Sequence, residues 1–315
     1  MPNCSVSTSP EFLQSPDSLK LTLYLLSSLS IPIYTFGAYC ILFKTPQQMS
    51  DMKWAMLNFH CWSVAFDLAV GFLFIPYLQI PALGDQTYLG MSFMGGVIVS
   101  VTCLFETRYF LLYGEGSTWK YIRRPWLAAN YFLAFAYMVP TYISFPDQLQ
   151  GKAELFEYIP CLPDFLLEDK YFIVTVHRGR VAMNVGVLVI PVPLESVFFV
   201  CIIYKNMRKM KKLARLSKKT LSLQRKFLSA LILQVTLPYI TMLVPIYLFE
   251  YSILKFHYNQ GLNNLSIMII SMHGAVSSVA MILLHKPYRD VVLGCVKWRK
   301  KSVAPKISEV LETRT

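Results

Sequence analysis

Long apolar stretches alternate with short polar ones along the chain, and this pattern predicts membrane-spanning helices. A span needs about 20 mostly apolar residues, because the hydrocarbon layer is roughly 30 Å thick and each helical residue rises about 1.5 Å. Seven stretches qualify: 21–43, 54–80, 88–113, 126–145, 181–204, 227–249 and 263–285. The pattern therefore predicts an all-α membrane protein, a bundle of seven transmembrane helices.

The first apolar stretch is interpreted as a retained span and not as a cleaved signal peptide. Residues 1–18 contain no Lys or Arg, so the basic segment that opens a signal peptide is missing. The apolar run of 23 residues also exceeds the apolar segment of a typical signal peptide. Residues 1–20 then form an N-terminal segment outside the membrane.

Composition supports a membrane protein and excludes the other broad classes. Of the 315 residues, 55% are hydrophobic and only 15% are charged, whereas soluble domains are about 25% charged. The chain therefore has too little polar surface to cover a soluble fold of this size. Its 45 aromatic residues and low charge also exclude intrinsic disorder.

Basic residues gather on one side of the predicted bundle and set its orientation. Segment 205–226 carries ten Lys and Arg residues and no acid, and the tail from Lys286 adds eight more bases. The positive-inside rule then predicts a cytoplasmic C-terminus and an external N-terminus. The net charge of +12 therefore reflects membrane topology and does not indicate nucleic-acid binding. Segment 205–226 could bind a G protein or anionic inner-leaflet lipid, or could serve topology alone.

The loops and motifs narrow the function further. Most loops are short, while the outer loop Pro146–Arg180 is long enough to form a lid. The sequence shows no internal repeat, which argues against a transporter built from duplicated halves. We find no H-E-x-x-H, G-x-S-x-G or P-loop pattern, no metal-ligand spacing and no Lys inside the last span for a retinal Schiff base. We therefore expect no enzyme, no metal and no cofactor.

Local motifs resemble a known receptor family. Residues 31–90 contain FKTP, M-x-x-x-KW-x-x-LN and W-x-x-x-x-DL, followed by PY-x-x-x-P. Further matches are ETRYFLLY at Glu106–Tyr113, PCLP at Pro160–Pro163 and HGAVSSVAMILLHKPYR at His273–Arg289. Together they resemble the nematode serpentine receptors of class H (Srh), which are seven-helix chemoreceptors.

The resemblance implies a chemosensory G-protein-coupled receptor of the plasma membrane, with the cilia of chemosensory neurons as a family location. It implies a heterotrimeric G protein as partner but no particular ligand, so small-molecule and peptide ligands both stay open. A ligand-gated seven-helix channel or a transporter is the alternative function.

Two motifs are candidates for G-protein coupling, by the same resemblance. The first comprises Glu106, Arg108 and Tyr109 at the end of the third span. Residues two apart on a helix point about 200° apart, so Glu106 and Arg108 are not expected to pair locally. The second comprises Pro287, Tyr288 and Arg289 after the last span. Simple snorkelling of a long basic side chain is the alternative role for Arg108.

The tail 286–315 is predicted to begin with a short amphipathic helix on the inner leaflet. Its apolar face carries Tyr288, Val291, Val292, Cys295 and Trp298. Cys295 is a palmitoylation candidate, with a plain buried cysteine as the alternative.

Two acids inside the predicted spans are candidates for buried polar roles. A central acid costs about 2.5–3.5 kcal/mol on insertion scales, so Asp67 and Glu195 should face the bundle interior. For Asp67 we expect a role in a structural polar network or in an ion site. Glu195 is the candidate for ligand contact, in a pocket expected among the outer halves of the helices, unless it is protonated or bonded to a neighbour.

Two cysteines, Cys4 and Cys161, are predicted to lie outside, where disulfides persist. We expect them either to pair or to remain free thiols. Asn3 begins an N-C-S sequon in the same segment and is a glycosylation candidate.

Overall fold

The computed structural model describes residues 13, 15–74, 86–144, 146–158, 178–212, 217–255 and 259–294, which are helices joined by short connections, with no strand among them. The helices are α1 (Pro16–Phe43), α2 (Ser50–Leu68), α3 (Gln86–Tyr109), α4 (Trp119–Ala136), α5 (Val139–Ile143), α6 (Gln148–Tyr158), α7 (Arg178–Val189), α8 (Pro191–Lys212), α9 (Lys218–Lys255), α10 (Gln260–Ile270) and α11 (His273–Leu284). A 3₁₀ turn, η2 (Gln47–Met49), precedes α2. The π-helical segments η3 (Ala69–Phe74) and η4 (Phe110–Gly114) extend α2 and α3.

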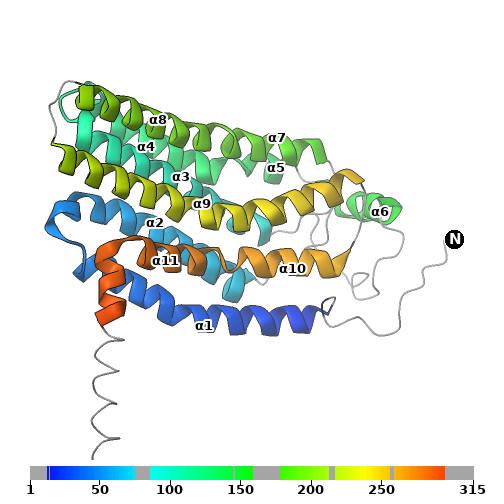
Figure 1. Cartoon of the computed structure of the whole chain (residues 1–315). Coiled ribbons are helices and arrows are strands. Elements are labelled where there is room, and N and C mark those ends of the chain that lie inside the picture. Colours follow the sequence, from blue (N-terminus) through cyan, green and yellow to red (C-terminus); the bar gives the residue numbers. More distant parts are fainter. Residues whose placement is uncertain are drawn as a thin grey trace, which may run out of the picture.

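In this part of the chain the helices form seven rods that lie side by side (Figure 1). Three rods are broken and consist of α4 with α5, α7 with α8, and α10 with α11. Among the described residues, six helices are long and apolar enough to cross a membrane. The fourth rod is not apolar enough to be counted with these six, because α4 begins with the basic residues Lys120, Arg123 and Arg124.

Prolines account for two of the breaks. Pro140 lies in the first turn of α5 and Pro191 begins α8, where the missing proline N–H leaves no helical hydrogen bond unmade. In contrast, α9 stays helical through both Pro238 and Pro245.

The basic segment 205–226 is largely helical, where the sequence pattern suggested a loop between spans. Helix α8 continues to Lys212 and α9 begins at Lys218. The segment is rich in Lys, Arg, Leu and Met, which favour helix, and contains no Gly or Pro. We call the end of the bundle where α8 ends and α9 begins the basic end. Helix α6, from the long predicted outer loop, lies at the opposite end (Figure 1).

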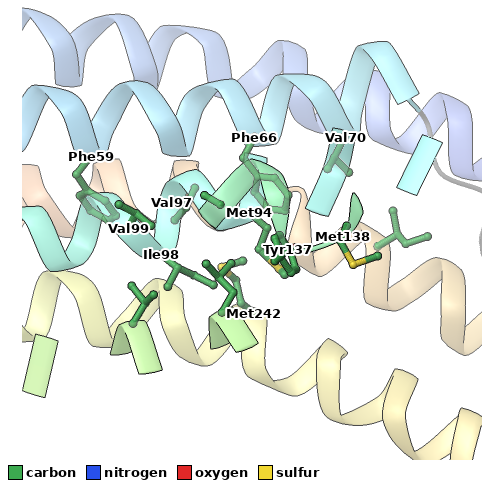
Figure 2. Packing of buried hydrophobic residues seen from close by; sticks show 14 of the residues in the cluster. Phe59, Phe66, Val70, Met94, Val97, Ile98, Val99, Tyr137, Met138 and Met242 are labelled. Atoms are coloured by element: carbon green, nitrogen blue, oxygen red, sulfur yellow. The ribbon is translucent and has the colours of Figure 1, made fainter. Parts of the chain in front are cut away.

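The core is divided into two apolar clusters along the bundle. One contains Leu19, Phe66 and Met94, and the other, nearer the basic end, contains Ile41, Leu104 and Leu228. Figure 2 shows part of the first cluster, which α2, α3 and α9 share. Of the six apolar helices, α3 has the largest buried share and is the central rod.

Large apolar side chains cover the outer surface as well. They include Leu21, Leu25 and Leu29 on α1 and Val244 and Tyr247 on α9. A continuous apolar exterior of this kind is unstable in water but suits hydrocarbon. The fold therefore has both the buried core and the lipid-compatible surface of a membrane bundle.

Candidate functional site

At the basic end, Glu106 of α3 is held by α4. Its carboxylate accepts hydrogen bonds from Trp119 Nε1 (2.7 Å), Arg123 Nε (3.1 Å) and Arg123 Nη2 (2.9 Å). Such a fork-shaped guanidinium–carboxylate contact is among the strong hydrogen-bonded ion pairs. The Arg123 guanidinium also lies 3.9 Å from the centre of the Phe110 ring. Glu106 thus ties α3 to α4 and leaves Arg108 to other partners.

Arg108 contacts α9 through an aromatic ring. Its guanidinium carbon lies 4.6 Å from the centre of the Phe227 ring, within the range of a cation–π interaction. Its Nε atom is buried and has no hydrogen-bond partner in the described part of the chain. Arg108 therefore links α3 to α9 without an acidic partner for its Nε.

The contacts continue from Phe227 across the end of the bundle. The Phe227 ring lies 5.4 Å from the ring of His285, which lies 5.7 Å from the ring of Tyr288. His285 Nε2 is also 2.8 Å from Gln234 Oε1 on α9. His285 is the C-cap of α11, so α11 is anchored to α9 where it ends.

Tyr288 closes this series of contacts at α1. Its side chain is fully buried and its hydroxyl lies 2.7 Å from Thr45 Oγ1. Since Thr45 donates its own proton to the carbonyl of Ile41 (2.6 Å), the Tyr288 hydroxyl is the donor. Burial raises the pKa of Tyr288 and keeps that proton in place. We call Arg108, Phe227, His285, Tyr288 and Thr45 the basic-end network.

The second motif lies on a short helix formed by residues 286–294, after a break at His285. Pro287 is in its first turn, and Arg289 makes only a long contact, 3.4 Å, to the carbonyl of Leu283. Tyr288 points into the bundle and not toward the lipid face on which the helical pattern placed it. Tyr109 packs on Phe199 of α8, with ring centres 5.7 Å apart. Of the six coupling candidates, the structure brings Arg108 and Tyr288 into one network.

Halfway along the bundle, Asp67 caps α11 from α2. Its Oδ2 atom accepts hydrogen bonds from the Tyr34 hydroxyl (2.6 Å), Gly274 N (2.7 Å) and Ala275 N (3.2 Å). In an unbroken helix those two N–H groups would bond to the carbonyls of residues 270 and 271. The carboxylate takes their place at the N-terminus of α11, where the helix dipole favours negative charge.

A cavity of about 350 Å³ lies between α3, α8 and α9, also in the middle of the bundle. It is lined mainly by apolar side chains, four of which, Phe59, Val97, Ile98 and Met242, are labelled in Figure 2. His273, the first residue of α11, also lines it. His273 is buried, and its Nδ1 has no hydrogen-bond partner in the described residues.

Comparisons with known proteins agree with this architecture and identify the family. The model of the Srh family, serpentine seven-transmembrane chemoreceptors of the G-protein-coupled-receptor type, matches residues 14–298. The chain belongs to the Srh family. A curated relative, serpentine receptor class H-72 of Caenorhabditis elegans, is 28% identical over 324 aligned positions that cover 95% of this chain and 92% of the relative.

The Srh chain also has the fold of a solved receptor. The crystal structure of squid rhodopsin superposes with a TM-score of 0.52, covering 90% of this chain and 85% of rhodopsin at 12% identity. At that identity the likeness concerns the fold alone. It confirms the fold class expected from the sequence, a seven-helix bundle like that of G-protein-coupled receptors.

The remaining candidates of the Srh chain stand apart from the cavity or outside the described residues. Glu195 faces Trp126 and Asn130 of α4 and does not line the cavity, and its Oε2 atom is buried without a hydrogen-bond partner in the described residues. The disulfide, glycosylation and palmitoylation candidates, Cys4 and Cys161, Asn3, and Cys295, lie outside the described residues. Among the residues that are described, no group of three or more His, Cys, Asp or Glu side chains could hold a metal.

Sequence reasoning missed several residues of the site. Thr45 and Tyr288 are 243 positions apart, and Arg108 and Phe227 meet from different helices. No local motif marks Thr45 or Phe227. His285 and His273 gave a signal, as polar residues at the end and in the interior of the last predicted span.

Proposed function

We propose that this Srh chain is a chemosensory receptor of the plasma membrane that binds a ligand and activates a heterotrimeric G protein at its basic end. The family is one of seven-helix chemoreceptors, and we propose no catalytic role. Anionic inner-leaflet lipid is a further proposed partner for the basic helix ends. Sensory cilia are the proposed location within the cell.

The basic-end network is the observation that carries the proposal. Arg108 joins α3 to α9 by a cation–π contact, which contributes about 0.5–2 kcal/mol. The state in which α9 has moved away from α3 is therefore accessible, because two receptor states typically differ by only a few kcal/mol. That movement would free the Arg108 guanidinium for a G protein. Pro238 and Pro245, each of which removes a backbone hydrogen bond from α9, supply points for bending.

The first experiment tests the two proposed roles of Arg108: holding α9 against α3 in the resting state, and contacting the G protein in the active state. The chain is expressed in cells with a calcium or cyclic-nucleotide reporter, and chemical mixtures are screened for a response. Phe227→Leu should raise ligand-free signalling about fivefold, the effect of losing roughly 1 kcal/mol from the resting contact. Arg108→Ala should abolish signalling while the amount of receptor at the cell surface stays unchanged.

Matched controls come from the same bundle. Phe132→Leu alters an exposed aromatic of α4, and Arg124→Ala removes an exposed base at the same end as Arg108. Both should leave signalling as in the unmodified chain. Full signalling by Arg108→Ala at normal surface level would remove Arg108 from the mechanism.

A further inference from the structure

The mid-bundle cavity has facing apolar walls on two helices. The cavity is lined from α8 by residues 193, 196, 197 and 200, and from α9 by residues 232, 235, 236, 238–240, 242 and 243. The α8 set follows the three-to-four-residue spacing of one helix face, and the α9 set covers a broader face of its helix. Val97, Ile98, Val101 and Phe105 of α3 close the cavity on its inner side. Its volume of about 350 Å³ is at the lower end of the range for small-molecule sites.

The cavity reaches the outer surface of the bundle between α8 and α9. Three of its lining residues are strongly exposed: Val197 at 58%, Ile240 at 52% and Leu243 at 45%. Ile240 and Leu243 lie near the middle of α9, far from both of its ends, and Val197 lies across from them on α8, so the surface around them faces hydrocarbon. Among the six apolar helices, α8 and α9 bury the smallest shares of their spans. A molecule dissolved in the bilayer therefore has direct access to the cavity.

Four polar residues line the cavity, Ser196, Thr236, the half-buried Tyr239 and His273, and a buried polar atom without a partner is found on His273. The Ser196 hydroxyl bonds with Thr102 (2.6 Å), and the Thr236 hydroxyl bonds to the carbonyl of Ile232 (2.8 Å). His273 is only 2% exposed, and its Nδ1 has no partner in the described residues. A buried polar atom of this kind normally has a hydrogen-bond partner. A single water is a poor one here, because a buried water needs two to four polar neighbours.

We propose that this cavity is the ligand site and that it takes a lipophilic small molecule with one hydrogen-bonding group. The ligand enters from the bilayer between α8 and α9, and its polar group bonds to His273. The acyl chain of a phospholipid does not meet this requirement, since it carries no hydrogen-bonding group at that depth. The proposal names the ligand class of the receptor proposed above and rests on that function.

The position of His273 connects the ligand to the rest of the bundle. The next two residues, Gly274 and Ala275, donate to Asp67, and α11 ends at His285 in the basic-end network. A ligand bonded to His273 thus acts on the first turn of the helix whose last residue contacts α9. The signal path that follows from this position runs along α11.

Binding can be tested without a G protein and without the natural ligand. The full chain is placed in phosphatidylcholine nanodiscs and photolabelled with a diazirine analogue of octanol, and the labelled peptides are identified by mass spectrometry. Label should fall on the cavity faces of α8, α9 or α3. Unlabelled octanol should displace it about tenfold more effectively than octane, the difference expected for one hydrogen bond.

Single substitutions test separately the opening between α8 and α9 and the hydrogen bond to His273. Val197→Trp should block the opening and reduce labelling about tenfold, whereas Val244→Trp, an exposed position of α9 that does not line the cavity, should leave it unchanged. His273→Phe should remove the advantage of octanol over octane, and His273→Gln should restore part of it. Because octane still measures the apolar site in the two His273 variants, retained octane displacement shows that these variants are folded, and signalling or thermal unfolding serves the same purpose for Val197→Trp.

Two results would overturn this inference. One is equal displacement by octanol and octane in the unmodified chain. The other is labelling of the same residues by a photoreactive phosphatidylcholine, if octanol does not displace that label. This result would make the occupant a lipid chain. Normal photolabelling without any G-protein response would contradict the proposed function alone. A chain that signals but shows no octanol-sensitive label in the cavity would contradict this inference alone.

Discussion

Asp67 shows how one buried carboxylate organises several helices. Its Oδ2 atom joins Tyr34 of α1 to the first turn of α11, while the residue itself belongs to α2. A buried carboxylate is costly unless hydrogen-bonded donors surround it. The free N–H groups at the start of α11 supply that environment, so the break in the seventh rod and the acid on the second stabilise each other.

Replacement of Asp67 by Ala should therefore destabilise the bundle. The change leaves the N–H groups of Gly274 and Ala275 and the Tyr34 hydroxyl without their acceptor, and we expect a loss of about 3 kcal/mol. Thermal unfolding of the detergent-solubilised chain should show a lower midpoint. Asp51→Ala is the control, because Asp51 is exposed in the first turn of α2 and makes only a 3.4 Å contact to Ser50. Equal midpoints for the two variants would contradict the capping role.

At the scale of elements, α11 is the helix that joins the two polar regions. It begins at the cap formed by Asp67 and ends at His285, which contacts Gln234 and Tyr288. Its close approach to α2 depends on Gly274. A Cβ atom at this position would lie 2.7 Å from the carbonyl oxygen of Ser63 and 2.9 Å from Asp67 Oδ2. Only glycine lets the two helices meet at this distance.

Gly274→Ala and Gly90→Ala should therefore change stability in opposite directions. The first must push α11 away from the backbone of α2, at a cost of about 1–3 kcal/mol. At Gly90, in α3, no other atom lies within 4 Å of the new Cβ, so alanine should stabilise the helix by about 0.5–1 kcal/mol. Thermal unfolding measured side by side would check both signs. A neutral Gly274→Ala would mean that α11 does not pack on α2 this tightly.

At the scale of the whole molecule, orientation in the membrane separates a receptor from a channel. The bases at the ends of α8 and α9 predict that this end faces the cytoplasm. A G-protein-coupled receptor needs the basic-end network on that side, whereas a ligand-gated channel with an internal N-terminus would place it outside the cell.

Epitope tags on intact cells test this orientation directly. A tag before residue 16 should bind antibody without permeabilisation, and a tag at residues 213–216 should bind only after it. Ligand should also evoke no current in membrane patches that lack G protein. The reversed pattern of antibody binding, or a current of this kind, would favour the channel.

The sequence alone determined the fold class, because the length of an apolar run is set by the bilayer and not by the neighbouring helix. It also predicted that Asp67 is buried in a polar network, since an isolated acid cannot face hydrocarbon. Pro140 and Pro191 lie at the breaks in the fourth and fifth rods, although the break before α11 depends on Asp67 and carries no such local signal.

Only the tertiary structure decided which side chains meet. The rotation of each helix about its axis is set by packing against its neighbours, and several polar residues on one rod compete for the interior. This rotation directs Glu195 to α4 and leaves His273 in the cavity wall, and it places Arg108 over Phe227. Apolar patterns identify the inward side of a helix. They do not identify the residue that a side chain contacts on another helix, because that contact joins distant segments and exists only once the seven rods are assembled.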